Sequence, residues 1–203
     1  MSGMRDEELV RRYLAGDKGS FGELVRRHER KVYNLAYRML GREEEARDAT
    51  QDAFLSAMRK LSGFRGDAAF STWLHRVTVN ACYDILRKRK HEPLLERQVG
   101  EEEDDRDHRL GRPEPSVGDH SEAAITAIDV RRALMLVPED FRVVLVLHDA
   151  QDLGYDEVAE ILGVPVGTVK SRLHRGRIAL ARALEPGPRE PEETERPSET
   201  GTP

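Results

Sequence analysis

The stretch Gly154–Leu184, GYDEVAEILGVPVGTVKSRLHRGRIALARAL, decides the fold class of this chain. Its apolar residues follow helical spacing twice, first over Tyr155–Leu162 and again after a break at Gly163. Ala159 is small enough for two helices to approach closely, Gly163 permits the positive φ of a tight turn, and Val169 can pack back onto the first helix. This spacing predicts a helix-turn-helix.

The second helix of this pair has two different faces. The inward face is apolar or small: Val169, Leu173, Gly176 and Leu180. The outward face is charged or hydrogen-bonding, as a helix that enters a DNA major groove requires: Thr168, Lys170, Ser171, His174 and Arg175. A solvated basic face on an ordinary pair of helices is the alternative interpretation. Because the turn, the packing residues and the polar stripe agree, the pattern favours DNA reading.

The composition limits the class of protein. The 203-residue chain has 35% charged and only 5% aromatic residues, which is typical of small helical domains combined with disordered segments. Cys82 is the only cysteine, which excludes an internal disulfide and a cysteine-based zinc site. The longest apolar run, Val143–Leu147, is too short to cross a bilayer, and the N-terminus lacks a signal-peptide pattern. We therefore expect a cytoplasmic protein that does not insert into a membrane.

The net charge of −5 conceals a division of the chain into four parts. Residues 1–91 carry a net charge of +6, residues 92–121 of −6, residues 122–184 of −1 and residues 185–203 of −4. The first and third parts are predicted to be helical domains, and the second and fourth a flexible acidic linker and a disordered acidic tail. The acidity of the whole chain therefore does not argue against nucleic-acid binding.

Periodicity and capping residues predict an all-α chain of two small domains, of which the second has four helices and ends in the helix-turn-helix. The expected helices span residues 6–15, 19–40, 43–61 and 70–90, then 123–137, 138–147, 155–162 and 166–184. A thirty-residue linker reaches ~30 Å when relaxed and ~100 Å when stretched. It can therefore join DNA sites two helical turns, ~70 Å, apart if it is extended.

One exposed face of the helix predicted over residues 43–61 combines acidic, amide and apolar groups. Its members are Asp48, Gln51, Asp52 and Leu55. Three interpretations are open: a solvated acidic patch, a metal site with two carboxylates, or a docking surface for a basic partner. Two carboxylates without a histidine or a third acid are weak support for a metal.

A glycine-flanked loop, GFRGDAA at residues 63–69, precedes a helix with an aromatic and basic face. That face carries Trp73, Arg76, Asn80, Tyr83 and Arg87, and the helix ends in a run of cations that includes Lys88. Single-stranded nucleic acid is bound by such a combination, because bases stack on rings while cations follow the phosphates. The alternative is that Trp73 is a half-buried core residue and the cations favour the helix C-terminus.

Four segments together resemble the extracytoplasmic-function (ECF) sigma factors, two-domain bacterial transcription initiation factors. They are SFGELV at residues 20–25, EARDATQDAFLSAMRKL at 45–61, FRGDAAFSTWLHRVTVNACYDILRKRK at 64–90 and LGYDEVAEILGVPVGTVKSRLHRGR at 153–177. The resemblance covers residues 5–91 and 122–184. The acidic linker and tail do not belong to the shared pattern.

The resemblance implies a role for each surface. Docking on the clamp helices of the RNA polymerase β′ subunit is implied for Asp48, Gln51, Asp52 and Leu55. Capture of a flipped base and binding of the melted non-template strand of the −10 element are implied for Phe64, Arg65, Asp67, Phe70, Trp73, Arg76, Asn80, Arg87 and Lys88. Reading of the −35 element as duplex is implied for Thr168, Lys170, Ser171, His174 and Arg175.

The resemblance also implies partners. They are core RNA polymerase, through its β′ clamp helices and β flap, promoter DNA, and an anti-sigma factor, which in this family often holds the sigma factor at the membrane. No cofactor, metal or small-molecule substrate is expected. Promoter melting needs binding energy for a flipped base, a few kcal/mol, and no chemical step.

Two other function classes are the alternatives. A stand-alone dimeric operator-binding regulator would show two-fold half-sites and would not need the acidic pair, but no dimerising heptad is visible. A nucleic-acid enzyme that uses Asp48 and Asp52 with magnesium would need a phosphate loop or a third carboxylate, which the sequence lacks. We therefore expect a binding protein rather than an enzyme.

Overall fold

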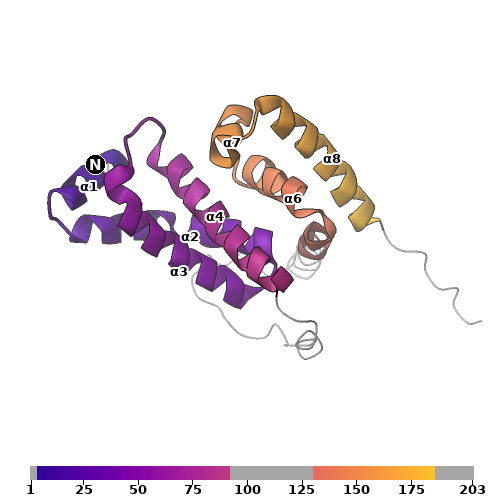
Figure 1. The fold of residues 1–203 in the computed structure, drawn as a ribbon, viewed down its shortest axis with the longest axis horizontal. Coiled ribbons are helices and arrows are strands. Elements are labelled where there is room, and N and C mark those ends of the chain that lie inside the picture. The colour runs from indigo at the N-terminus through magenta and orange to yellow at the C-terminus, as the bar shows by residue number, and fades with distance from the viewer. Residues whose placement is uncertain (1–3, 92–129, 186–203) are drawn as a thin grey trace, which may run out of the picture.

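The computed structural model describes residues 4–91 and 130–185, and these residues form helices and helical turns with no strand among them (Figure 1). The all-α fold class predicted from the sequence is confirmed. The predicted linker, the predicted tail beyond residue 185 and the first part of the helix expected from residue 123 lie outside the described residues.

The N-terminal module consists of four α-helices and one short 3₁₀ turn. They are α1 (Asp6–Leu14), α2 (Gly19–Leu40), α3 (Glu43–Lys60), η1 (Leu61–Gly63) and α4 (Phe70–His91). Gly41 ends α2 in the left-handed conformation, with φ 78°. Helix α3 begins with three glutamates and ends with Arg59 and Lys60, which matches the sign of the helix dipole at both ends.

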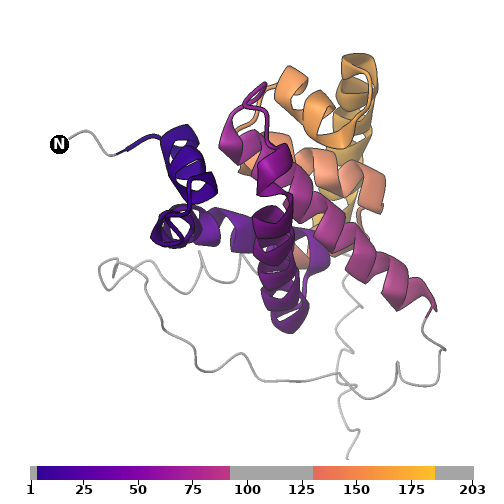
Figure 2. The ribbon, with the colours of Figure 1, turned by 60° about the vertical axis from the view of Figure 1, so that its left-hand side comes forward.

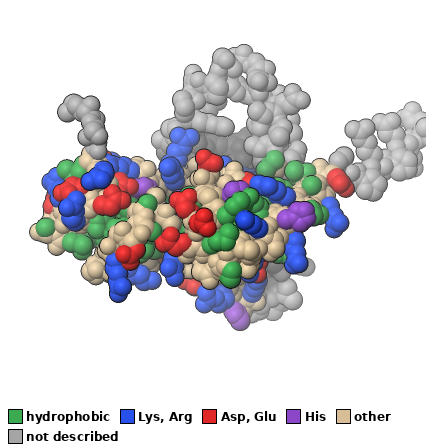
Figure 3. All heavy atoms as spheres, turned by 90° about the horizontal axis from the view of Figure 1, so that it is seen from above, with side chains coloured by type: hydrophobic (Ala, Val, Ile, Leu, Met, Phe, Trp, Pro, Cys, Tyr) green, Lys and Arg blue, Asp and Glu red, His purple; other side chains and the backbone are tan. Residues whose placement is uncertain are grey.

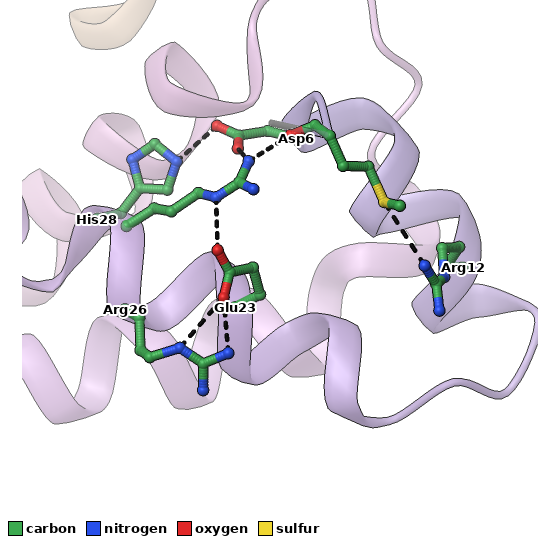
Figure 4. Close-up of polar contacts among 7 residues, drawn as sticks. Asp6, Arg12, Glu23, Arg26 and His28 are labelled. Carbon is green, nitrogen blue, oxygen red and sulfur yellow. Dashed lines mark hydrogen bonds and ion pairs between the residues drawn. The ribbon is translucent and has the colours of Figure 1, made fainter. Parts of the chain in front are cut away.

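Helix α1 is attached to α2 by an ion-pair network (Figure 4). The Asp6 carboxylate lies 2.6 Å from Nε2 of His28 and accepts a hydrogen bond of 3.0 Å from Arg27. The His28 ring is buried and packs edge-on against Phe70, with centroids 5.4 Å apart. His28 is therefore a packing residue with a carboxylate partner.

Over residues 130–185, the C-terminal module follows the sequence expectation except in one turn. Residues 130–136 are helical, followed by α6 (Glu139–Leu145), η3 (Val146–Ala150), α7 (Tyr155–Leu162) and α8 (Val166–Leu184). The helix predicted to continue as α to residue 147 changes to a π-helical turn at Val146. The chain folds back there, because His148 Nδ1 lies 2.7 Å from the carbonyl of Leu153 and the Leu153 N–H donates to Leu147.

The two modules are in contact, which the sequence did not predict. Two views show α7 and α6 beside α4 (Figures 1 and 2). One hydrophobic cluster lies within α1–α4, whereas a second joins residues of α2, α3 and α4 to residues of α6, η3, α7 and α8.

The physical reason lies in α4, which buries two faces. The predicted face begins with Phe70, Leu74 and Val77, which are buried, but Ala81 and Ile85 are only half-buried. A second buried stripe was missed: Thr72, His75, Val79, Cys82 and Leu86. Val79, Cys82 and Leu86 belong to the cluster shared with the C-terminal module.

His75 is buried in α4 with one ring nitrogen unsatisfied. The residue is 5% exposed, and its Nδ1 has no hydrogen-bond partner within the described part of the chain. Burial, with smaller contributions from nearby His28 and Lys31, lowers the pKa of His75 to about 4, and Glu157 opposes the shift only in part. The structure therefore accommodates the neutral imidazole.

We expect His75 to make the fold sensitive to acid. Its folded-state pKa lies below the ordinary value of 6.5, so the unfolded chain binds more protons between pH 6.5 and about 4. The stability that His75 permits above pH 6.5 is lost as the pH falls through this window, by about 2 kcal/mol at pH 5. Urea unfolding at pH 7.5 and pH 5 measures the loss. His75→Leu should reduce the difference by that amount, and an unchanged pH dependence would contradict the assignment.

Candidate functional site

The acidic face predicted on α3 is formed as expected. Asp48, Gln51, Asp52 and Leu55 are all exposed and follow one another at helical spacing. Within the described residues, neither Asp48 nor Asp52 forms an ion pair or a side-chain hydrogen bond, whereas Glu43 pairs with Arg47. Met58, one turn beyond Leu55, is 39% exposed, as is Leu55, and extends the apolar part of the face. Sequence reasoning missed Met58, although its i, i+3 spacing to Leu55 was visible.

The loop before α4 forms a pocket with aromatic walls. Its volume is about 250 Å³, and the lining includes Phe64, Arg65, Asp67, Trp73 and Arg76. The ring centroids of Phe64 and Trp73 lie 5.5 Å apart, at a tilt of 57°. Two tilted rings can present both a ring face and a ring edge to another aromatic group.

Phe70 lies beneath this pocket rather than in its lining. Its side chain is 1% exposed, and its ring centroid lies 5.8 Å from Phe64 and 5.7 Å from Trp73. Trp73 itself is half-buried, so it belongs both to the packed cluster and to the pocket. Phe70 therefore holds the two rings that a base could contact.

The aromatic and basic face of α4 continues from the pocket toward the helix C-terminus. Arg76, Asn80, Arg87 and Lys88 are exposed, and Tyr83 is half-buried. Arg87 pairs with Asp84 one turn earlier at 2.9 Å, but both side chains remain more than 60% exposed. Such an exposed pair contributes little to stability and can exchange its partner for a phosphate.

The helix-turn-helix has the predicted turn and packing. Gly163 has φ 65°, and Val158, Ile161, Val169 and Leu173 are at most 4% exposed. Glu157 accepts a hydrogen bond from the Gly154 N–H at 2.9 Å and so caps the start of α7.

Gly176 brings α8 unusually close to α6. A Cβ at this position would lie 3.0 Å from Cγ of Leu145 and 3.3 Å from Cβ of Phe141. A larger side chain would therefore require Leu145 and Phe141 to give way by a few tenths of an ångström. Gly176 therefore fixes how the recognition helix is seated on its module.

The outward stripe of α8 is positioned for contact with a partner. Lys170, Ser171, His174 and Arg175 are exposed, and Thr168 is half-buried at the helix start. Two neighbouring arginines of α8 are paired: Arg172 with Asp140 and Arg177 with Asp149. Arg175 has no carboxylate partner within the described residues. Lys170 and Arg175 of the predicted reading face are therefore among the α8 cations that have no carboxylate partner within the described ranges.

Tyr155, at the start of α7, joins this stripe and was missed. The Lys170 ammonium lies 5.5 Å from the centroid of the Tyr155 ring, and that ring stacks on His148 with centroids 4.7 Å apart. Tyr155 is 37% exposed. An exposed aromatic residue at a helix N-terminus was the available signal. On the face seen from above, acidic and basic side chains are interspersed, so no single-sign patch dominates this face (Figure 3).

No helix within residues 4–91 or 130–185 is long and apolar enough to cross a membrane. These same residues contain no group of three or more His, Cys, Asp or Glu side chains that could hold a metal ion.

Comparison with known families and proteins agrees with this arrangement. The model of Sigma-70 region 2 matches residues 24–92, and that of Sigma-70 region 4 matches residues 127–180. The ECF RNA polymerase sigma factor SigM of Mycobacterium tuberculosis is 43% identical over 179 residues, which are 88% of this chain and 84% of SigM.

Two solved structures share the fold. CnrH in complex with the cytosolic domain of CnrY has a TM-score of 0.64 and 25% identity, and the alignment covers 88% of this chain and 96% of CnrH. RpoE from Bartonella quintana, in complex with the anti-sigma factor NepR, has a TM-score of 0.64 and 24% identity, with 83% and 98% coverage. The chain therefore belongs to the ECF RNA polymerase sigma factors and is a promoter-specific transcription initiation factor.

Proposed function

We propose that this sigma factor docks on the β′ clamp helices of core RNA polymerase through Asp48, Gln51, Asp52 and Leu55. The support is that these side chains are exposed on one face of α3 and that, among residues 4–91 and 130–185, both carboxylates lack partners. Unpaired carboxylates around an exposed leucine suit a basic surface with an apolar centre. The protein acts as a binding subunit and not as an enzyme.

The melted −10 strand is bound by the pocket and the exposed face of α4. The pocket with Phe64 and Trp73 in its walls is the observation that carries this proposal. Rings at 5.5 Å provide a stacking site for a flipped base, and Arg65 and Asp67 provide hydrogen-bonding groups beside it. Arg76, Asn80, Arg87 and Lys88 then line the path of the strand, and Phe70 supports the rings from below.

The −35 element is read as duplex by the outward stripe of α8. Thr168, Lys170, Ser171, His174 and Arg175 lie at the N-terminal half of this helix, the end that a recognition helix inserts into the major groove. The stand-alone regulator considered above does not account for the α3 face or the α4 pocket. Because the chain also belongs to the sigma factor family, no observation favours the stand-alone regulator.

An anti-sigma factor controls access to these surfaces. RpoE, which shares the fold, was solved with the anti-sigma factor NepR. We place the protein in the cytoplasm, where polymerase and promoter are found, with any attachment to the membrane made through that partner. No cofactor, metal or small-molecule substrate is required.

The proposal is tested by reconstitution. The purified chain is mixed with core polymerase and a library of genomic fragments, and RNA 5′ ends are mapped. We expect initiation at a small set of positions that share −10 and −35 sequences and that are absent with core polymerase alone. Initiation without a shared sequence, or none at all, would overturn the proposal.

Arg175→Ala is expected to weaken binding to the −35 duplex by ~1–3 kcal/mol and to relax preference at one position. The reason is that the Arg175 guanidinium, which has no carboxylate partner in the part of the chain that the structure describes, lies on the proposed reading face. Arg177→Ala is the matched control, because Arg177 is held by Asp149 at 2.6 Å and should lose less. Binding to all single-base variants of the element measures both. An equal loss over every sequence would reassign Arg175 to a phosphate contact.

A further inference from the structure

The tyrosine that begins the helix-turn-helix contacts the proposed reading face as well as its own module. Tyr155 is the first residue of α7, and the Lys170 ammonium lies over its ring, 5.5 Å from the centroid. The ring also stacks on His148 of η3, with a centroid distance of 4.7 Å and an interplanar angle of 22°. One ring therefore joins a side chain of the recognition helix to the turn that precedes α7.

His148 is itself held by the backbone and is half-buried. Its Nδ1 lies 2.7 Å from the carbonyl oxygen of Leu153, and because a carbonyl can only accept, Nδ1 is the donor. The Leu153 N–H donates in turn to the carbonyl of Leu147, at 3.2 Å. The imidazole that supports the Tyr155 ring is thus fixed where the chain folds back, before any DNA is bound.

The Tyr155 ring restricts the direction of Lys170. Lys170 is exposed and has no carboxylate partner among residues 4–91 and 130–185. A lysine carries its charge as a point at the end of a flexible stem, so an unrestrained lysine can follow the phosphates of any sequence. A cation over an aromatic face is attracted by the ring quadrupole, which favours the rotamers that place the ammonium there. Fewer directions are therefore open to the Lys170 ammonium before it meets the groove, and less entropy is lost on binding.

Arg175 lies on the same stripe without such a support. Within the described ranges its guanidinium lies over no aromatic ring, in contrast to the ammonium of Lys170. An arginine carries its own planar fork of donors, which matches the edge of a base, whereas a lysine needs a neighbour to orient its charge. Arg175 is therefore an internal comparison for Lys170.

We propose that Tyr155 and His148 are positioning residues that direct Lys170 to one base pair of the −35 element and so set the preference at that pair. The contact is that of an ammonium donating to the O6 and N7 acceptors that guanine presents in the major groove. This inference rests on the proposed function of α8 and adds to it two residues outside α8. Neither ring touches a base in this role.

Replacement of the ring tests the inference in the assembled holoenzyme. The full chain is combined with core polymerase, and binding is measured to promoter fragments that carry every single-base change in the −35 sequence found by reconstitution. We expect Tyr155→Leu to reduce discrimination at one base pair ~2-fold to 5-fold, the effect of a cation–π contact at an exposed site. Tyr155→Phe keeps the ring and should retain that discrimination. His148→Ala should reduce discrimination at the same pair, because the Tyr155 ring loses its support.

Variants of Lys170 and Arg175 provide two reference backgrounds. Tyr155→Leu should have no further effect at that base pair once Lys170→Ala is present. Its effect should multiply with that of Arg175→Ala, because the free-energy changes of independent sites add. An effect of Tyr155→Leu that is equal over all sequences, or that persists beside Lys170→Ala, would overturn the positioning role. A loss in Tyr155→Phe as large as that in Tyr155→Leu would also overturn it, since the hydroxyl and not the ring would then matter.

The outcomes separate the inference from the proposed function. A wild-type holoenzyme without any −35 preference would overturn both, whereas a −35 preference that a folded Tyr155→Leu leaves unchanged would overturn the inference alone. A nuclear magnetic resonance measurement on the wild-type chain without DNA needs no variant. The side-chain methylene protons of Lys170 should resonate upfield of their values in an unfolded chain, because the ring current of Tyr155 shields them. Unshifted Lys170 protons would overturn the contact, and this measurement decides if Tyr155→Leu loses its helicity by circular dichroism.

Discussion

Asp52→Lys is expected to weaken assembly with core RNA polymerase by more than about 100-fold, which corresponds to about 3 kcal/mol or more. Asp52 lies at the centre of the exposed face of α3, between Asp48 and Leu55. A lysine there replaces an attraction with a repulsion against a basic partner and leaves that partner's cation unpaired. Fluorescence anisotropy of the labelled chain, titrated with core polymerase, measures the change.

The control for this prediction carries the same change in charge. Glu29→Lys on α2 also changes the net charge by +2, at an exposed position that forms no ion pair within the described residues. We expect Glu29→Lys to change polymerase affinity by less than threefold, and the −35 duplex affinity of Asp52→Lys to match that of the wild type. Retained polymerase binding by Asp52→Lys would remove α3 from the interface.

Trp73→Ala is expected to spare closed-complex formation and to reduce promoter opening by about 5-fold to 150-fold. The estimate follows from ~1–3 kcal/mol for stacking of one base on an aromatic ring. Trp73 shares the pocket with Phe64 and Arg65, so the loss should fall on the step at which a base leaves the duplex. Permanganate reactivity of thymines in the −10 element measures opening, and a mobility shift measures the closed complex.

Two further variants separate stacking from packing, because Trp73 is half-buried against Phe64 and Phe70. Trp73→Phe keeps a ring and should retain most of the opening. Leu74→Ala truncates a fully buried neighbour and should cost stability, ~2–5 kcal/mol, without a selective effect on opening at a temperature where it is folded. Unchanged thymine reactivity in Trp73→Ala would assign the tryptophan to the core alone.

Local signals allowed much of the fold to be predicted from the sequence. The bounds of α2 and α7 agree with expectation because Gly41 and Gly163 end these helices in the left-handed conformation, a requirement visible in the residues themselves. The exposed stripe of α8 also follows from helical phase. What the stripe and the α3 face bind stays a prediction.

Contacts between distant segments were not predictable in the same way. The stripe that includes His75 and Cys82 reads as a second, weaker periodicity on a helix whose first face already explains its burial. The π-helical turn at Val146 is accompanied by a hydrogen bond between His148 and the Leu153 carbonyl. Helix propensities do not predict this contact. Arg142 reads from the sequence as a surface cation, because nothing local indicates that three carbonyls enclose it.

The close seating of α8 at Gly176 has a consequence for how promoter preference can change. The helix proposed to face the bases packs closely on Leu145 and Phe141, which would lie 3.0 Å and 3.3 Å from a Cβ added at Gly176. A methyl group added at Gly176 requires these side chains to give by a few tenths of an ångström. If α8 tilts in response, every side chain along its outward stripe is displaced. A substitution at Gly176 can therefore change which promoter sequences are preferred, although this buried residue itself contacts no nucleotide.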